Sequence, residues 1–214
     1  MDIPWIDQST VKGKQITALL ERVMVWRRAC GLSGSSKEYD FFLGCYGNPN
    51  SSIMFLAEVP SLKGLQKAIR NFRNEPLWQS AWNVSYGNKV FRETLFKNGF
   101  ITNQNEPWKW KCWITDLVKC GEKDKDWKSI KKNNPEMKSK ILQKSAEFLE
   151  EEIGIIKPKM IVVMRNQTAD LYDEYIKSDV LDVRAPHYAR MASNRIPIYK
   201  SRFKKIKKWF NQLK

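Results

Sequence analysis

Polar side chains that could carry out chemistry stand at or near the ends of the short apolar runs of this sequence. They are Glu58, Asp116, Arg165, Asn166 and His187. Carboxylates and imidazoles are the groups that enzymes use most often to orient water, move protons and stabilise developing charge. Each residue also has a structural interpretation, since a carboxylate can cap a helix and a sole histidine is more often structural than catalytic. Their shared position after apolar runs favours one polar site.

The apolar runs themselves predict the strands of a sheet. Short runs that are rich in apolar, β-branched or aromatic residues are typical of buried parallel strands. The predicted strands are residues 53–57, 110–118, 160–164 and 180–185. Helical patterns lie at residues 10–29, 88–98, 135–156 and 166–178, whereas residues 34–50 and 119–134 are predicted to be loops.

A further helix is predicted at the end of the chain. Apolar residues there follow one another at steps of 4, 3, 4 and 3 positions, the spacing of one helix face: Tyr199, Phe203, Ile206, Phe210 and Leu213. Alternating strands and helices predict an α/β fold, a three-layer α/β/α sandwich with a central, mostly parallel four-stranded sheet. Because parallel strands end at one edge, where such sheets bind ligands, we expect the polar side chains to converge there.

The chain is strongly basic, and the excess charge is unevenly placed. Its 38 Lys and Arg against 23 Asp and Glu give a net charge of +15. Residues 184–214 contain ten Lys or Arg and no Asp or Glu, which is two-thirds of that excess. A surface of one sign suits a polyanion, because neutralised phosphates release counterions, so nucleic acid is the leading partner. A solvated, solubilising face is the alternative.

Length and composition bound the class of protein. A chain of 214 residues, 42% of them hydrophobic and nine of them Trp, has enough apolar material to fold, which excludes a disordered protein. We predict a single domain over residues 1–214 with a basic C-terminal segment, 184–214. No apolar run of membrane-spanning length and no secretion signal is present, so we expect a protein of the cytoplasm or nucleus that does not bind a membrane.

The cysteines are too widely spaced to predict a metal site. Cys30, Cys45, Cys112 and Cys120 are separated by 15, 67 and 8 positions, and no CxxC pair occurs. Such spacing is not typical of zinc sites, and the lack of a secretion signal favours four reduced thiols.

Four stretches of the chain resemble, in order, motifs of the uracil-DNA glycosylase superfamily, in particular those of its thermophile-type branch. Residues 47–61, GNPNSSIMFLAEVPS, resemble the first motif, which reads GEAPG after an apolar strand. Residues 114–120, ITDLVKC, resemble TNVVKC, and residues 156–164, IKPKMIVVM, resemble a strand with a PKVIVALG-like sequence. Residues 186–190, PHYAR, fall where the family has a His-Pro-Ser motif and its DNA-inserting loop. The resemblance spans roughly residues 26–210.

The resemblance implies a DNA glycosylase, which flips a base out of the duplex and cleaves it from its sugar with water. Glu58 would then orient or activate the water, or stabilise the cationic sugar. His187 would donate a hydrogen bond to the departing base, where negative charge develops. Asp116 would face the flipped base. Candidates for stacking on that base are Trp78, Trp82 and Tyr86, although most aromatic residues of the chain are expected to fill the core.

The resemblance also implies which residues contact DNA. Arg190 and Met191 would lie on the loop that enters the space left by the base, and Ser61 closes the first motif. Lys and Arg of the C-terminal segment would bind phosphates. The implied DNA-binding residues are Ser61, Arg190, Met191, Arg195, Lys204 and Lys205. The expected partner is single- or double-stranded DNA, and the protein is expected to be a monomer.

Departures from the family pattern concern the pocket for the base. The family's Asn is Asp116 here, and an ionised carboxylate only accepts hydrogen bonds, whereas uracil offers both a donor and an acceptor. Asp116 would suit uracil only when protonated, so a base with an exocyclic amine beside a ring N–H, or a deaminated purine, is an alternative. Side chains also replace glycines of the first motif. Two functions stay open: excision of uracil or another modified base, and a catalytically inactive nucleic-acid-binding protein on the same fold.

The thermophile-type branch also holds an iron-sulfur cluster on four cysteines. Cys30 and Cys120 match two of its ligands, but Ser33 and Ser145 stand at the other two positions. Two thiolates do not hold such a cluster, so we predict that the protein has no cofactor and no metal.

Overall fold

The structure is a computed structural model that describes residues 3, 5–29, 45–59, 86–103, 106–119, 126–187 and 195–213. Its strands are β1 (Tyr46–Gly47), β2 (Ile53–Ala57), β3 (Trp113–Asp116), β4 (Met160–Met164) and β5 (Leu181–Ala185). Its helices are α1 (Val11–Ala29), α5 (Tyr86–Lys97), α6 (Asp126–Asn133), α7 (Pro135–Ile156), α8 (Asn166–Tyr175) and α9 (Ile196–Gln212). Within these ranges, none of the helices combines the length and the hydropathy that a membrane span needs.

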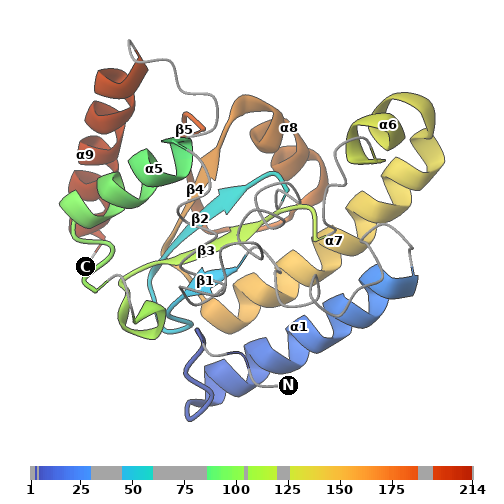
Figure 1. Ribbon diagram of the computed structural model, residues 1–214, viewed down its shortest axis with the longest axis horizontal. Coiled ribbons are helices and arrows are strands. Elements are labelled where there is room, and N and C mark those ends of the chain that lie inside the picture. The colour runs from blue at the N-terminus through green and yellow to red at the C-terminus, as the bar shows by residue number, and fades with distance from the viewer. Residues whose placement is uncertain are drawn as a thin grey trace.

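The described strands form one sheet in the order β1-β3-β2-β4-β5 (Figure 1). β2 lies parallel to both β3 and β4, and β5 lies parallel to β4, whereas β1 pairs with β3 in the antiparallel direction. Every residue of β2, β3 and β4 is buried. Strands that helices cover on both faces need apolar residues at consecutive positions, which explains the unbroken apolar runs of β2 and β4.

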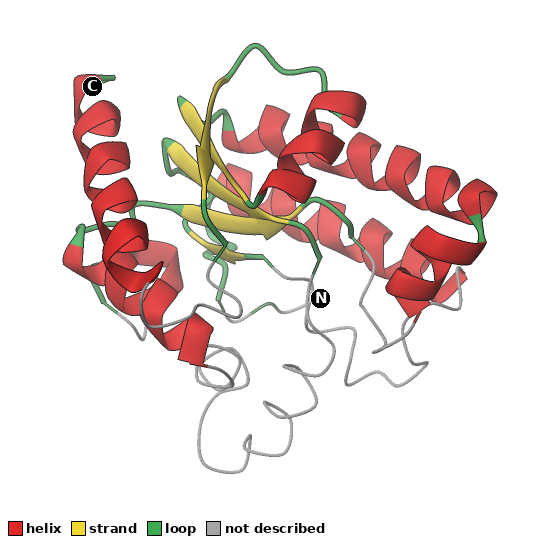
Figure 2. Cartoon of the chain, turned by 90° about the horizontal axis from the view of Figure 1, so that it is seen from above, coloured by secondary structure: helices red, strands yellow, loops and turns green. Residues whose placement is uncertain are grey.

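Helices cover both faces of the sheet, which makes three layers (Figure 2). On one face Phe55 of β2 stacks on Phe203 of α9, with ring centroids 5.7 Å apart, and meets Phe91 of α5 edge-on at 6.0 Å. On the other face the indole N–H of Trp113 in β3 donates to Glu152 of α7 at 2.6 Å. The predicted α/β/α sandwich is therefore confirmed, and β2, α7 and β4 begin and end at the predicted residues.

Two predictions about the elements are wrong. The described sheet has five strands and not the predicted four. The fifth strand, β1, is not predicted because its two residues are too few to form a recognisable pattern. At Gly47 of β1 the φ angle is 117° and a Cβ would lie 2.2 Å from the carbonyl oxygen of Cys112, so this close pairing requires glycine. Residues 119–134, predicted to be a charged loop, contain α6, whose Trp127 is buried and whose Ile130 packs against the core.

Candidate active site

The first carboxylate at the carboxyl edge of the sheet is Glu58, which directly follows β2 and is 4% exposed. Its Oε1 accepts hydrogen bonds from Lys131 Nζ at 2.6 Å and from the indole N–H of Trp127 at 3.2 Å. Its Oε2 accepts from the guanidinium of Arg165 at 2.8 Å. Burial alone opposes ionisation, but these donors, Lys131 first among them, outweigh it and hold the pKa of Glu58 below its usual value. Glu58 is therefore an ionised and firmly oriented carboxylate at neutral pH.

The residues that hold Glu58 come from two distant parts of the sequence. Trp127 and Lys131 are four positions apart on α6, so one face of that helix presents both. Arg165 follows β4, and its backbone N–H donates to the carbonyl of Ala185 in β5 at 2.8 Å. Trp127 and Lys131 carry no recognisable signal in the sequence, because their spacing is informative only once α6 is known to be a helix. Arg165 is recognisable from the sequence as a strand-end residue, but its role is not.

The second carboxyl group is Asp116, the last residue of β3, and it is 7% exposed. Burial raises the pKa of Asp116 to about 8. The neighbouring carboxylates of Glu152 and Glu58 add to this rise, whereas the cations Lys119 and Arg27 oppose it. At neutral pH the group is therefore mostly protonated, so that it offers both an O–H donor and an acceptor oxygen.

A buried ion pair between Lys119 and Glu152 lies beside Asp116; the two residues are 3% and 0% exposed. Lys119 also donates to Thr115 Oγ1 at 2.7 Å. Glu152 also accepts from Thr115 at 3.1 Å and from the indole of Trp113 at 2.6 Å. These contacts join the strand that ends at Asp116 to α7, and satisfied buried networks of this kind hold their members in one arrangement.

The histidine, His187, lies two residues beyond β5 and is partly buried. Burial lowers the pKa of His187 to about 4; the positive charge of Arg165 adds to the fall, and the negative charge of Glu58 opposes it. The imidazole is therefore neutral at neutral pH. A neutral ring carries one N–H donor, so His187 can donate a hydrogen bond without giving up a proton.

These electrostatic effects relate the three residues for which sequence analysis predicts roles in the reaction. Glu58 influences the pKa of both Asp116 and His187, and Arg165 bonds to Glu58 while it influences His187. The carboxyl edge of the sheet thus holds an ionised carboxylate, a protonated carboxyl group and a neutral imidazole.

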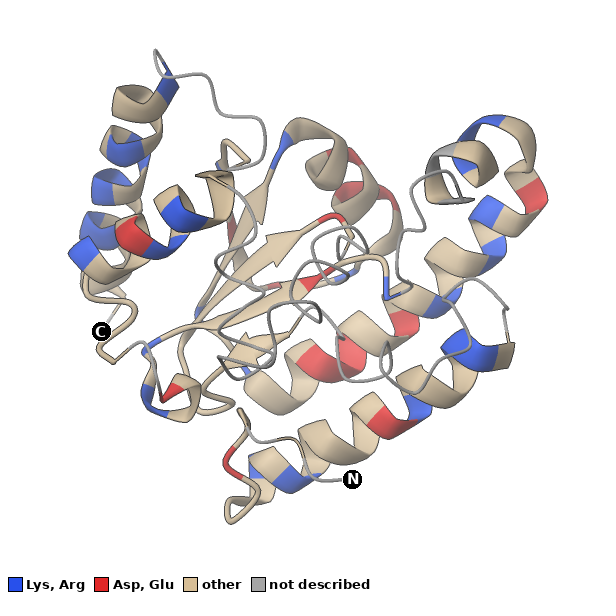
Figure 3. Ribbon diagram, in the orientation of Figure 1, with Lys and Arg blue, Asp and Glu red and all other residues tan. Residues whose placement is uncertain are grey.

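The remaining predicted site residues are either exposed on α5 or at α9, or lie outside the described residues. Tyr86 is the exposed first residue of α5, and the exposed Arg195 directly precedes α9. Lys204 and Lys205 are exposed on α9, which carries basic and no acidic residues along its length (Figure 3). The predictions for Ser61, Trp78, Trp82, Arg190 and Met191, and for the cluster positions Cys30, Ser33 and Cys120, lie outside the described residues.

The described cysteine and serine positions bear on the prediction for an iron-sulfur cluster. The hydroxyl of Ser145 accepts a hydrogen bond from the backbone N–H of Lys119 at 3.1 Å. Cys45 and Cys112 are buried free thiols, and burial raises the pKa of both above the usual range. Among the described residues, no group of three or more His, Cys, Asp or Glu is arranged to hold a metal ion.

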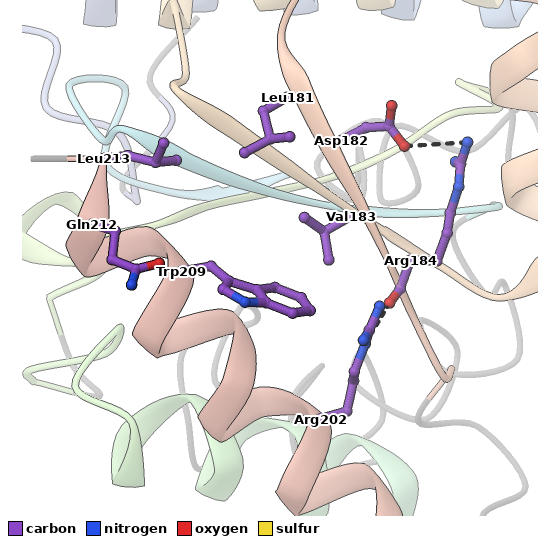
Figure 4. A pocket seen from close by; sticks show the side chains of 8 residues that line it. All are labelled: Leu181, Asp182, Val183, Arg184, Arg202, Trp209, Gln212 and Leu213. Carbon is purple, nitrogen blue, oxygen red and sulfur yellow. Dashed lines mark hydrogen bonds and ion pairs between the residues drawn. The ribbon is translucent and has the colours of Figure 1, made fainter.

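A separate hollow of about 450 Å³ lies between β5 and α9 (Figure 4). Trp209 and Arg202 line it from α9, with the guanidinium 5.0 Å from the ring centroid. Arg202 also donates to the backbone carbonyl of Arg184 in β5 at 2.8 Å. The lining includes none of the residues at the carboxyl edge, so this hollow is distinct from the candidate active site.

The fold and the site together define an α/β protein whose reactive groups stand at the carboxyl ends of parallel strands. The family model of the uracil DNA glycosylase superfamily matches residues 45–214. The chain therefore belongs to the uracil DNA glycosylase superfamily. A comparison with curated proteins gave no match.

Proposed function

We propose that this protein is a DNA glycosylase, which takes a base out of the DNA stack and hydrolyses the bond between that base and its sugar. Family membership supports this class of reaction. The observation that carries the proposal is an arrangement: ion-paired Glu58 follows β2, Asp116 ends the neighbouring strand β3, and His187 follows β5 at the same edge of the sheet. The pKa shift of each residue suits one part of the reaction.

Glu58 acts on the sugar side of the reaction. As the bond from C1′ to the base nitrogen breaks, its electron pair moves to the base and the sugar becomes cationic. The ionised carboxylate stabilises that positive charge and accepts a hydrogen bond from the water whose oxygen bonds to C1′. Because the pKa of Glu58 is lowered, the carboxylate is a weak base. The water therefore releases its proton late, after the new C–O bond has begun to form; the proton passes to Glu58 and on to the solvent, from which the released base anion takes up a proton.

His187 acts on the side of the departing base. The base leaves with the electron pair of the broken bond, and part of the negative charge resides on its carbonyl oxygen. A neutral imidazole donates its N–H to that oxygen and stabilises the charge without transferring a proton. The low pKa of His187 supports this role, because it keeps the ring neutral.

Asp116 recognises the base. A protonated carboxyl group can donate to a carbonyl oxygen and accept from a ring N–H, which is the pattern that uracil presents. The raised pKa of Asp116 therefore supports uracil as a substrate at neutral pH. The same group can also accept from an exocyclic amine and donate to a ring nitrogen, so cytosine-type bases with modified substituents are further candidates.

The proposed DNA-binding element is α9. Its apolar face, with Phe203, Ile206 and Phe210, is buried, and Phe203 stacks on Phe55 of the sheet. Lys204 and Lys205 are exposed on the outer face. Exposed cations on a rigid helix suit the phosphates of DNA. We propose single- or double-stranded DNA as the partner of a monomer, in the cytoplasm or nucleus.

Replacement of Lys204 and Lys205 by Met is expected to weaken DNA binding and its dependence on salt. Each lost phosphate contact should reduce the slope of log affinity against log salt by about 0.9 between roughly 50 and 200 mM salt. Lys14→Met is the control for loss of an exposed lysine elsewhere, because Lys14 lies on α1, which packs on α7 on the other face of the sheet (Figure 2). Fluorescence anisotropy with labelled DNA measures both slopes. An unchanged slope in the double variant would contradict the role of α9.

We propose that the activity needs no iron-sulfur cluster. Ser145, at a position where the related branch has a ligand, already bonds to the backbone of Lys119, and a hydroxyl is a poor substitute for a thiolate. The purified protein is expected to be colourless and free of iron. Stoichiometric iron with visible absorbance, measured after anaerobic purification, would contradict this proposal.

The function is tested with oligonucleotides that each carry one modified base. Uracil, hypoxanthine, xanthine and 5-hydroxymethyl bases are placed in single- and double-stranded DNA, and alkali then converts any site without a base into a strand break. Breaks that appear with the wild type and disappear with Glu58→Gln support the glycosylase. DNA binding without breaks on any base would instead support the catalytically inactive nucleic-acid-binding protein.

A further inference from the structure

In the described part of the chain, three side chains donate hydrogen bonds to Glu58, and they differ in their exposure to solvent. Trp127 is 1% exposed, the side chain of Lys131 is 30% exposed and the side chain of Arg165 is 49% exposed. The carboxylate itself is buried. The donor with most access to solvent, and hence to a bound molecule, is therefore Arg165.

The two oxygens of Glu58 are held differently. Oε1 accepts from Trp127 and Lys131, both on α6, whereas the donor described for Oε2 is Arg165. The proposed reaction requires Glu58 to accept a hydrogen bond from the attacking water. Since Oε1 already has two donors and one is described for Oε2, Oε2 is the oxygen better suited to the water, and Arg165 shares it in the structure.

Arg165 also has an unusual backbone. Its φ of 85° and ψ of 142° lie in a region that residues with a side chain rarely adopt. Such a conformation costs energy and is commonly found where a side chain must be aimed at a functional site. Arg165 is aimed at Glu58 and lies within electrostatic range of His187.

The charge balance around Glu58 leaves the strand ends positive. One carboxylate faces two cations, Lys131 and Arg165, so one positive charge is in excess. A guanidinium forms paired hydrogen bonds to phosphate as readily as to carboxylate, because both anions present two oxygens to its planar fork. A phosphate next to the flipped nucleotide can therefore compete with Glu58 for Arg165.

We propose that Arg165 is a phosphate-binding residue that bonds to Oε2 of Glu58 only while DNA is absent, and that Lys131 and Trp127 are positioning residues that keep Oε1 fixed throughout. This inference rests on the proposed function. When a phosphate takes the guanidinium, Arg165 no longer competes with the attacking water for Oε2, and both lone pairs of that oxygen can accept. One cation also moves away from the place where the sugar becomes positive, which strengthens the stabilisation that Glu58 supplies.

Arg165→Gly tests the role in phosphate binding. Glycine adopts the φ of 85° without strain, so this variant is expected to fold at least as well as the wild type. Its log affinity for DNA should depend less steeply on log salt, by about 0.9 in slope, and its loss of activity should appear chiefly as a higher half-saturating DNA concentration. Arg165→Lys retains the charge and is expected to restore most of the slope. An unchanged slope in Arg165→Gly would overturn the proposal.

Lys131→Met tests the positioning role, with Lys132→Met as its control on the same helix, because Lys132 is exposed and lies one position beyond the lysine that bonds to Glu58. Lys131→Met is expected to lower the saturating single-turnover rate by about tenfold or more. It should also raise the pKa of Glu58, because a neighbouring cation is lost, and so move the fall of the rate at low pH, the acid limb of the pH profile, to a higher pH. Lys131→Arg should restore both. A saturating rate and acid limb like those of Lys132→Met would overturn this role.

Failure of the inference can be told from failure of the proposed function. If the wild type cleaves no base, the proposed function fails, but the salt slope of Arg165→Gly still tests phosphate binding. Carbon-13 NMR titration of Glu58 reports the pKa without DNA, and loss of either cation should raise it. With DNA bound, Arg165→Gly should no longer raise the pKa of Glu58, because the guanidinium has already left; a raised value there would overturn the exchange.

Discussion

Glu58→Gln is expected to reduce single-turnover excision by roughly 10²–10³-fold. The amide keeps the shape of the side chain but carries no negative charge, so it does not stabilise the cationic sugar. Lys131 and Arg165 lose their carboxylate partner, but both are partly exposed and can be hydrated, so the variant is expected to fold. DNA binding should be retained or become tighter, because a negative charge is removed from the surface that faces phosphate.

The control for this substitution is Glu136→Gln. Glu136 is exposed in the first turn of α7 and pairs with Lys140 one turn further on, so its replacement removes the same charge from an exposed ion pair that does not include Glu58. Quenched-flow measurement with DNA under excess enzyme compares the two variants. If Glu58→Gln excised its base at a rate within threefold of the control, the proposed role of Glu58 would be wrong.

Excision of uracil is expected to slow as Asp116 ionises. The carboxyl group is neutral below its pKa of about 8 and anionic above it, and the anion has no proton to donate to the base. The single-turnover rate should therefore be level near neutral pH and fall roughly tenfold per pH unit above the pKa. His187, with its pKa of about 4, does not titrate in this range. The charged groups that act on Asp116 are Lys119, Glu152, Glu58 and Arg27.

Two variants test whether ionisation of Asp116 causes this fall in the excision rate at high pH, the alkaline limb of the pH profile. Asp116→Asn should remove it, because an amide does not ionise, and should leave a rate that is level across the same pH range. Glu152→Gln should move it to lower pH, because loss of the neighbouring negative charge lowers the pKa of Asp116. Circular dichroism must accompany the second variant, since it breaks the buried pair with Lys119. An alkaline limb that persists in Asp116→Asn belongs to another group and contradicts the role of Asp116.

The same pKa shift affects the stability of the fold. The folded protein retains a proton on Asp116 that the unfolded chain releases at the lower pKa of an ordinary Asp. The contribution of Asp116 to stability is therefore complete below that ordinary value and declines as pH rises toward about 8.

Some of the structure follows directly from the sequence. The consecutive apolar residues of β2 and β4 are sufficient to predict buried parallel strands, and the position of Glu58 directly after β2 follows from that prediction. The strand predicted at residues 110–118 is longer than β3, which ends at Asp116. The short β1 and α6 are not predictable in this way. β1 depends on its pairing with β3, and α6 depends on burial of Trp127 against distant residues.

The partners and protonation states of the site residues are harder to predict from the sequence than the position of the site. Lys131 and Arg165 lie 73 and 107 positions from Glu58, so local patterns do not reveal that they hold it. Likewise, Asp116 is expected to be ionised from its residue type, and only its burial beside Glu152 explains why it is mostly protonated. The sequence indicates which groups are present, and their protonation depends on packing.

The stacking of Phe203 on Phe55 has a consequence for how DNA is held. Phe55 lies in β2, the strand that ends just before Glu58, and Phe203 lies in α9, next to Lys204 and Lys205. Because α9 packs directly on β2, the lysines of α9 and the carboxylate of Glu58 are held at a fixed distance from each other. If the proposed function is correct, the phosphates that bind to α9 determine which nucleotide along the strand can reach Glu58.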